Sequence, residues 1–524
     1  MRNRGFVGLA LVLLSSPAAL AQQAPRSVDT QQTERQIQQR ELEFRRARKP
    51  APKVPGLAPF QSRAGHQPLF VLSSVKVDGA TVVAPDVIAS AYVPYLNKKV
   101  SQSDLETIAN AITELYRKRG YHLSRAIVPP QDVVGGHLHV KVIEGSIVEV
   151  RIDGDSAEKF GVKEHLDALT AEHPSRLATV ERQLLLANGT PGMRVVDTAL
   201  EELGSASGRF QLIVKVETWR IYESVGLDSY GSYAVGPLQA YSSTFFNSYL
   251  AKGDTLNLNL STVPDATRDL RYGRISYGIP IGPDGVRLGA TVSRSEVWPD
   301  DYRRQVDTRT INQFYELRGS FVPLESRQSA LTITAAFAAT DEAEKDTFGT
   351  DYNDHIRIVR LSGDYRLQDQ LDGTNYFTAG IRQGISGLGA SASDDLSTSR
   401  AGARPDFSIF EYSYTRFQTL SDAWSIKANV SGQLASEPLL SSQTFYLGGA
   451  GFGPGYYNAD NGIAGLVELR FDRSTAGILI KHYQLYAFTD GGEVGTAGEP
   501  KQQLASVGAG VRLDFVDEFH AGAA

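Results

Sequence analysis

The longest regular pattern in the chain is an alternation of apolar and polar residues that begins after Trp219. In Trp424–Leu434 the even positions are apolar, apart from Gly432, and the odd positions are polar. Strict alternation predicts β-strands with one apolar and one polar face. Fourteen such segments, separated by Gly, Pro, Asp and Asn, can be counted between Glu223 and Phe515.

These segments favour a membrane barrel over a water-soluble sandwich, which would also alternate. Their length is near the ~9–11 residues that a tilted strand needs to cross a bilayer. Their polar faces carry full charges, including Arg287, Arg360, Asp364 and Arg512, so the enclosed interior must be wet. The sequence therefore predicts an antiparallel β-barrel at residues 220–524.

Two shorter regions with mixed strand and helix periods precede the barrel. In the first, residues 69–145, apolar residues between Leu105 and Leu115 recur at spacings of three and four, which predicts a helix. A similar order of elements recurs at 146–219, so we predict two α+β units in tandem. The predicted strands are Phe70–Val77, Ser124–Val128, His137–Ile143, Ile147–Ile152, Val195–Glu201 and Phe210–Val216, and the second unit's helices are Val162–Leu169 and Thr179–Leu186.

The sequence of residues 1–68 predicts three successive segments, none of which has a packed core. Residues 1–21 have the basic, apolar and small-residue parts of a secretory signal peptide, and cleavage is expected after Ala21. Residues 22–48 hold a polar helical tract that suits wet surroundings, and residues 49–68 form a Pro-rich, extended linker. The alternative for residues 22–68 is a floppy basic tail.

Composition and missing motifs exclude several classes of function. The 524 residues include no cysteine, which removes disulfide scaffolds, Cys-based zinc sites and thiol catalysis. The formal net charge of −6 argues against a nucleic-acid partner. There is no H-E-x-x-H, G-x-x-x-x-G-K-[ST] or G-x-S-x-G motif. We therefore predict that the protein is not an enzyme and has no catalytic residue, metal site or cofactor.

The segments Leu123–Asp132 and Gly136–Gly145 make the interpretation specific. They resemble the closing half of a POTRA domain of the two-partner secretion transporters (TpsB type, ShlB/FhaC/HecB-like haemolysin secretion/activation proteins). These outer-membrane proteins belong to the superfamily that contains BamA. The family order is a signal peptide, a plug helix, a linker, two POTRA domains and a 16-stranded barrel. The resemblance implies the same mixed fold here, with POTRA domains at 69–145 and 146–219 in the periplasm of a Gram-negative cell.

Two barrel segments extend the resemblance. One is similar to the family's long loop, which folds back into the barrel and carries an Arg-Gly-Tyr/Phe tip. The candidate lumen residues of that loop are Gly453, Pro454, Gly455 and Tyr456. The other segment is similar to the F-x-D-x-G motif of the barrel wall, with candidate residues Phe488, Asp490 and Gly492.

Pro454 departs from the family pattern because it stands at the arginine position. In the family, the arginine of the loop reaches the aspartate of the wall, which here is Asp490. Either another cation substitutes, or the rigidity of proline and backbone contacts hold the loop. The alternative is that the two segments are only a surface loop and an Asp-Gly turn.

The resemblance implies an outer-membrane transporter that captures an unfolded partner exoprotein and conducts it through the barrel. Capture by β-augmentation needs an exposed strand edge. The candidate edge residues are Ser124, Arg125, Ala126, Ile127 and Val128. We expect an exoprotein partner with an N-terminal secretion domain, contact with outer-membrane lipid, and a monomeric state. A BamA/TamA-like assembly factor is the alternative, ahead of a passive porin.

The end of the chain departs from the family as well. The fourteenth strand ends at Phe515, and His520–Ala524 resembles the start of a fifteenth. We therefore expect a barrel that is incomplete at its C-terminal end.

Overall fold

The protein is described from a computed structural model that places residues 51–57, 65–228, 235–236, 238–393, 395–449, 453–475, 480–515 and 519–523. The chain forms two units: Lys49–Thr218 with Gly282–Asp284, and Trp219–Ile281 with Gly285–Ala524. The predicted signal peptide and the polar tract at 22–48 lie outside the described residues.

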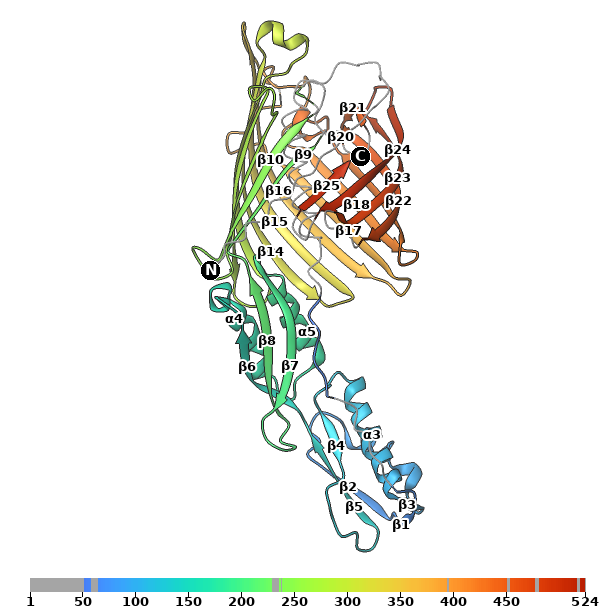
Figure 1. Ribbon diagram of the computed structural model, residues 1–524. Coiled ribbons are helices and arrows are strands. Elements are labelled where there is room, and N and C mark those ends of the chain that lie inside the picture. Colours follow the sequence, from blue (N-terminus) through green and yellow to red (C-terminus); the bar gives the residue numbers. More distant parts are fainter. Residues whose placement is uncertain are drawn as a thin grey trace. The chain divides into compact units, whose positions relative to one another are not determined.

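The first half of the smaller unit packs one long helix on a three-stranded sheet of order β2-β5-β4 (Figure 1). Helix α3 starts with a capping box, in which Asp104 N donates to Ser101 Oγ and Ser101 N donates to Asp104 Oδ2. Its apolar face places Ile108, Ile112 and Tyr116 in the core. The elements are β1 (Pro68–Val71), β2 (Ser74–Asp78), α2 (Pro85–Ala89), β3 (Lys99–Ser101), α3 (Gln102–Lys118), β4 (Arg125–Ile127) and β5 (His137–Ile143).

The predicted single strand Phe70–Val77 is in fact two strands in different sheets. β1 pairs with β3, whereas β2 pairs in parallel with β5. The break falls at Leu72, whose side chain is fully buried, and at Ser73, whose N–H donates to Gly136 O at 2.8 Å. The sequence of this segment does not reveal the corner, because the corner depends on tertiary contacts.

The second half of the smaller unit has a sheet of order β6-β8-β7, with β6 parallel and β7 antiparallel to β8. Its core includes the buried side chains of Phe160, Leu184 and Phe210. Val54 and Leu57, from the Pro-rich segment, pack against the same core. The elements are β6 (Ser146–Asp153), α4 (Val162–Asp167), α5 (Leu177–Asn188), β7 (Met193–Glu202) and β8 (Arg209–Thr218).

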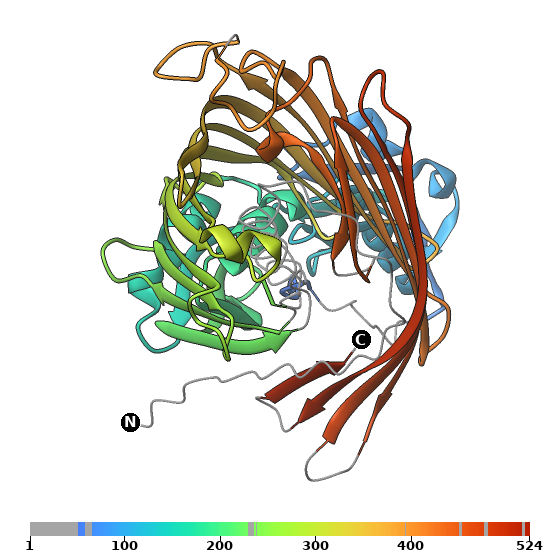
Figure 2. The same ribbon diagram turned by 90° about the horizontal axis from the view of Figure 1, so that it is seen from above.

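The larger unit is an antiparallel sheet of fifteen described strands, which follow one another in chain order except that β19 pairs with β22, past the separate hairpin β20–β21. The sheet curves around a common interior (Figure 2). Fourteen strands of this sheet lie between Ile221 and Phe515, so the predicted fold class and strand count are confirmed. They are β9 (Ile221–Asp228), β10 (Gln239–Asn247), β11 (Thr255–Thr262), β12 (Leu270–Ile281), β13 (Val286–Val297), β14 (Arg309–Glu325), β15 (Ser329–Asp346), β16 (Gly349–Gln368), β17 (Gly373–Gly384), β18 (Ser408–Thr419), β19 (Trp424–Ala435), β22 (Asn461–Ser474), β23 (Ile480–Gly495) and β24 (Gln502–Phe515), followed by β25 (Phe519–Ala523).

The two faces of this sheet have opposite chemistry. Neighbouring residues of β19 show it, since Leu434 is 57% exposed and Gln433 is 4% exposed. The same holds in β12 for Ile275, which points outward, and Ser276, which points inward. The sheet therefore turns an apolar surface outward and a polar one inward, as a barrel in lipid requires.

The connections differ between the two ends of the sheet. Those at one end, such as 326–328 and 369–372, are short turns, whereas 298–308, 385–407 and 436–460 at the other end are long.

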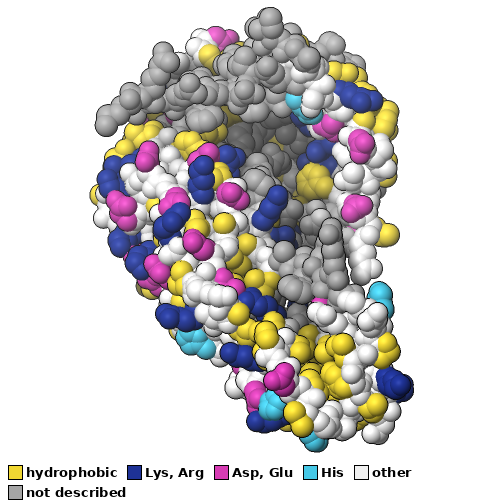
Figure 3. All heavy atoms as spheres, turned by 60° about the horizontal axis from the view of Figure 1, so that its bottom comes forward, with side chains coloured by type: hydrophobic (Ala, Val, Ile, Leu, Met, Phe, Trp, Pro, Cys, Tyr) yellow, Lys and Arg dark blue, Asp and Glu magenta, His cyan; other side chains and the backbone are white. Residues whose placement is uncertain are grey.

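Among the described residues, no helix is long and apolar enough to cross a membrane. On the face shown in Figure 3, acidic and basic side chains are interspersed, and neither charge forms a separate patch.

Candidate functional site on the inner wall and at the first sheet edge

The inner wall of the large sheet carries charged side chains that pair across strands. Glu316 of β14 accepts from Arg318 Nη1 at 3.1 Å and from Arg360 Nη2 of β16 at 3.0 Å. The attraction of two guanidinium groups offsets the cost of removing this carboxylate from water, so it can remain charged. The wall therefore presents fixed charges to a hydrated interior instead of an apolar core.

A second group of ion pairs lies on the later strands. Glu468 of β22 receives Arg470 and, at 2.9 Å, Arg512 of β24. The guanidinium of Arg382 on β17 lies 3.1 Å from Glu411 of β18. The alternation predicted that charged residues face inward, but their partners depend on strand register, which the sequence does not reveal.

A short hairpin, β20 (Phe445–Gly449) with β21 (Gly453–Ala459), lies against the inner face of β22 and β23. Leu447 is fully buried in a cluster with Ala464 and Val494. A Cβ atom built on Gly492 would overlap Leu447 Cδ1, and one on Gly462 would lie 2.6 Å from Phe445 Cγ. Two glycines of the wall thus make room for two apolar side chains of the hairpin.

The base of the hairpin is tied to the wall by polar contacts. Arg382 donates to Gln433 Oε1 at 2.8 Å and to Gln443 Oε1 at 2.9 Å. Gln433 Nε2 in turn donates to the backbone oxygens of Gln443 and Asp460. Asp460 also forms an ion pair with Arg400. Both ends of the hairpin segment are therefore held by buried hydrogen bonds.

The predicted tip residues lie in or beside a bulge of this hairpin. Tyr456 pairs with Gly448 and Gly453 pairs with Gly449, which leaves Pro454 and Gly455 as the extra residues. Proline has no N–H to donate, but a bulged residue is not paired in the ladder, so a proline there removes no ladder hydrogen bond. The side chains of residues 453–456 lie outside the described part of the structure.

The predicted wall residues Phe488, Asp490 and Gly492 follow one another on the inner face of β23. Asp490 is 5% exposed and accepts from Ser506 Oγ at 2.5 Å. Its other oxygen, Oδ2, is buried and has no hydrogen-bond partner among the described residues. The ring of Phe488 packs over Gly508, where a Cβ would lie 2.6 Å from Phe488 Cε1.

The predicted edge residues Ser124–Val128 surround β4, a strand of three residues that pairs only with β5. Ala126 N donates to Thr113 Oγ1 at 3.0 Å, and Arg125 Nη2 lies 2.8 Å and 2.9 Å from the two oxygens of Glu202. Ser124 is fully buried and accepts from Gly145 N. The opposite edge of the sheet is β2, beyond which no described strand pairs.

Glu144, directly after β5, connects the sheet to the β2–α2 connection and to helix α3. Its carboxylate accepts from Thr81 N at 2.7 Å, Tyr116 Oη at 2.8 Å and Val82 N at 3.1 Å. Burial alone would raise the pKa of Glu144, but the bonds from Thr81, Tyr116 and Val82 outweigh burial and lower it. A Cβ on the adjacent Gly145 would lie 2.6 Å from the Leu123 carbonyl carbon, so this position must be small.

An outward apolar and inward ion-paired β-sheet, preceded by two small α+β units, defines an outer-membrane barrel protein. The comparisons give the family. Residues 70–145 match the POTRA domain of ShlB type, and residues 211–513 match the haemolysin secretion/activation protein ShlB/FhaC/HecB. The chain therefore belongs to the ShlB/FhaC/HecB family of haemolysin secretion/activation proteins.

Relatives cover most of the chain. It is 25% identical over 479 residues to the heme/hemopexin transporter protein HuxB of Haemophilus influenzae (strain 86-028NP), covering 84% of this chain and 78% of that protein. It is 27% identical over 290 residues to the outer membrane transporter CdiB of Escherichia coli, covering 52% and 47% of the two chains. The solved structure of CdiB from Escherichia coli matches with a TM-score of 0.74 and 20% identity over 95% of this chain and 94% of that chain.

Membership settles the broad function and the compartment. The protein is a two-partner secretion transporter of the outer membrane, its POTRA units lie in the periplasm, and its partner is a secreted protein. Because the POTRA units precede β9 in the chain, the end of the sheet where β9 begins faces the periplasm. The long connections therefore lie at the extracellular end.

Proposed function

We propose that this protein binds an unfolded exoprotein with an N-terminal secretion domain in the periplasm and conducts it through the barrel interior. The observation that carries the proposal is the inner wall, whose charges are already paired with one another. A polypeptide can pass such a wall without binding tightly to any one side chain. Conduction then depends on the polar, hydrated surface and not on the sequence of the client.

Capture is proposed at an edge of the first POTRA sheet, where main-chain hydrogen bonds recognise extended peptides regardless of sequence. The two edges differ. At β4, the candidate edge Ser124–Val128, Thr113 already occupies the N–H of Ala126 and Glu202 holds Arg125. At β2, five residues with exposed Ser74, Lys76 and Asp78 are open to pairing. These contacts favour β2 over β4.

The hairpin β20–β21 is proposed as the element that narrows the path. Leu447 and Phe445 pack into recesses above Gly492 and Gly462, so apolar contacts hold the hairpin. Apolar side-chain packing is thus a third possibility for how the loop is held, beside a substitute cation and the combination of proline rigidity with backbone contacts. The roles of Gly453, Pro454, Gly455, Tyr456, Phe488, Asp490 and Gly492 are part of this proposal.

Residues 22–48 are proposed to form a removable plug, because the tract is polar on all sides and suits a wet interior. The proposed boundaries are 1–21 for the signal peptide, 22–48 for the plug, 49–68 for the linker, 69–145 and 146–219 for the POTRA domains and 220–524 for the barrel. The transporter is proposed to act as a monomer and to carry out no covalent chemistry.

The test is whether a client protein is secreted by host cells to which only two genes have been added, one for the client and one for this transporter. The client is the secreted protein encoded next to this transporter. It is expressed with a C-terminal epitope in a Gram-negative host. We expect the epitope in the medium with the transporter and in the periplasm without it. A client retained in the periplasm, together with better assembly of other barrels, would instead favour the assembly-factor alternative.

The choice between the two sheet edges is tested separately. A photo-reactive residue is placed at Lys76 of β2 or at Ile127 of β4 in the same secreting cells. Cross-links to the client from position 76, with few from position 127, are expected. The reverse pattern would return the binding edge to Ser124–Val128.

A further inference from the structure

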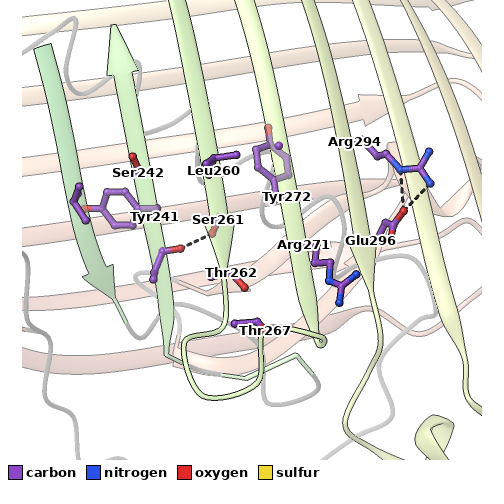
Figure 4. A pocket seen from close by; sticks show the side chains of 13 residues that line it. Tyr241, Ser242, Leu260, Ser261, Thr262, Thr267, Arg271, Tyr272, Arg294 and Glu296 are labelled. Carbon is purple, nitrogen blue, oxygen red and sulfur yellow. Dashed lines mark hydrogen bonds and ion pairs between the residues drawn. The ribbon is translucent and has the colours of Figure 1, made fainter. Parts of the chain in front are cut away.

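A hollow of about 730 Å³ lies on the outer wall of the barrel, in strands β9–β13 (Figure 4). Most of its lining side chains belong to the outward face, because they share the register of Leu260, which is 62% exposed. These outward lining residues belong to two adjacent cross-strand rows, of which only Leu227 does not line the hollow. The rows are Leu227–Ala240–Thr262–Arg271–Glu296 and Val225–Ser242–Leu260–Gly273–Arg294.

The shape follows from the size of the residues in these rows. Ala240, Ser242 and Gly273 are small, and a Cβ on Gly273 would meet only Leu260 Cδ2, at 3.8 Å. Two larger side chains, Leu260 and Arg294, stand on either side of Gly273 in its row. The volume lies within the ~300–1,000 Å³ of small-ligand sites. The floor is mainly apolar, with hydroxyl groups of Ser242, Thr262 and Thr267 at its edge.

One side of the hollow carries three charged side chains, Arg271, Arg294 and Glu296. Glu296 is shared by Arg294, whose Nη2 lies at 2.6 Å, and by Arg309, whose Nη2 lies at 2.8 Å. Arg271, directly across from Glu296, has no carboxylate partner among the described residues. Its guanidinium carbon lies 5.3 Å from the ring centroid of Trp298. Asp265 and Asp269, in the adjoining connection, do not line the hollow.

The height of the cluster places it at the outer leaflet. Along β13 the outward residues from the periplasmic end are Val286, Leu288, Ala290 and Val292, and only then Arg294 and Glu296. Charges on the lipid face cost little only near the interface, at about 0–1 kcal/mol. A tryptophan beside arginines is also typical of an interfacial belt.

We propose that this hollow binds a phosphorylated glycolipid of the outer leaflet, of the lipid A type. Arg271 and Arg294 would hold a phosphate, the three hydroxyl groups would meet the sugar, and an acyl chain would lie along Leu260 and Val225. Arginine guanidinium groups match phosphate geometry and bind it by charge-assisted hydrogen bonds. The site lies on the opposite face of the wall from the proposed path of the client, so the two proposals stand or fall separately.

The test is native mass spectrometry of the full-length protein in detergent, titrated with diphosphoryl lipid A or with phosphatidylglycerol. We expect preferential binding of lipid A, weakened by about tenfold in Arg271→Gln because a charge-assisted phosphate contact is lost. Gly273→Leu places a large side chain on the floor of the hollow and leaves its charge unchanged. It should weaken lipid A binding by a similar factor.

Matched controls separate the site from general effects. Arg404→Gln removes an exposed arginine of another extracellular connection, and Gly319→Leu adds an outward leucine away from the hollow. Both should bind lipid A as the wild type does. Equal lipid A affinity in the wild type and in Arg271→Gln and Gly273→Leu would overturn the site. Equal binding of phosphatidylglycerol would overturn the choice of a glycolipid.

Discussion

Leu447 of the lumenal hairpin lies fully buried over Gly492 of the barrel wall, in the space that a side chain at position 492 would occupy. The contact explains why a glycine follows Asp490 two residues later on the inner face of β23. It also supports the proposal that apolar packing holds the hairpin against the barrel wall.

Gly492→Ala is expected to displace the hairpin, because its Cβ would overlap Leu447 Cδ1 and lie 2.8 Å from Ile463 O. Overpacking of this kind costs about 1–3 kcal/mol. Limited proteolysis of the folded protein should then cut faster within the hairpin segment 445–459. Gly491→Ala is the control, since its Cβ would meet only ordinary contacts at 3.7–3.8 Å. Equal proteolysis of the two variants would argue against the seating.

Asp490→Asn is expected to leave barrel stability unchanged or slightly higher. The substitution keeps an acceptor for Ser506 Oγ and removes a buried charge whose second oxygen has no partner among the described residues. The readout is the temperature at which the barrel loses its folded gel mobility. If a cation elsewhere in the chain pairs with Asp490, the free energy of unfolding of the variant should instead fall by about 3–5 kcal/mol.

Glu468→Gln should destabilise the barrel by about 3–5 kcal/mol, because Arg470 and Arg512 would lose their shared carboxylate in a nearly buried site. The same gel assay applies. Glu493→Gln is the matched control, since Glu493 pairs with Lys501 at the exposed rim and should contribute less than about 1 kcal/mol. A similar loss of stability in both variants would mean that the buried ion pairs of the inner wall stabilise the barrel no more than an exposed pair does.

Glu144→Gln should lower the stability of the first POTRA unit at neutral pH by about 1–3 kcal/mol, because Thr81, Val82 and Tyr116 all donate to this carboxylate. The folded-state pKa of Glu144 is lowered, so its contribution is present above the unfolded value of about 4.3 and is lost as pH falls through the folded value. Hydrogen exchange of peptides from 70–145 in the full-length protein measures this. Wild-type protection should fall in acid, whereas that of the variant should change less. Parallel pH profiles would contradict the assignment.

Sequence patterns predicted the elements that depend on local periodicity. The apolar spacing from Leu105 to Leu115 lies within α3, and the alternating segments correspond to the fourteen strands of the large sheet from β9 to β24, without the hairpin β20–β21. A strand of a barrel is specified by its own two faces, so alternation alone is sufficient to find it. The split between β1 and β2 was missed, because it depends on the distant Gly136.

The site was less accessible to sequence reasoning. The aspartate and glycine of the wall motif could be placed on one face by their spacing, but Leu447 as the partner of Gly492 could not. Likewise, Arg360 and Glu316 are 44 residues apart, and only register across β14, β15 and β16 brings them together. Contacts of this kind carry no signal in a single sequence.

The central claim, that the client passes through the barrel interior, is tested most directly by photo-cross-linking at two neighbouring positions of β12. Ser276 points inward and is 6% exposed, whereas Ile275 points outward and is 54% exposed. A client halted during secretion by a folded C-terminal domain should cross-link to a photo-reactive residue at 276 and not to one at 275. Cross-links from 275, or none from 276, would contradict passage through the interior.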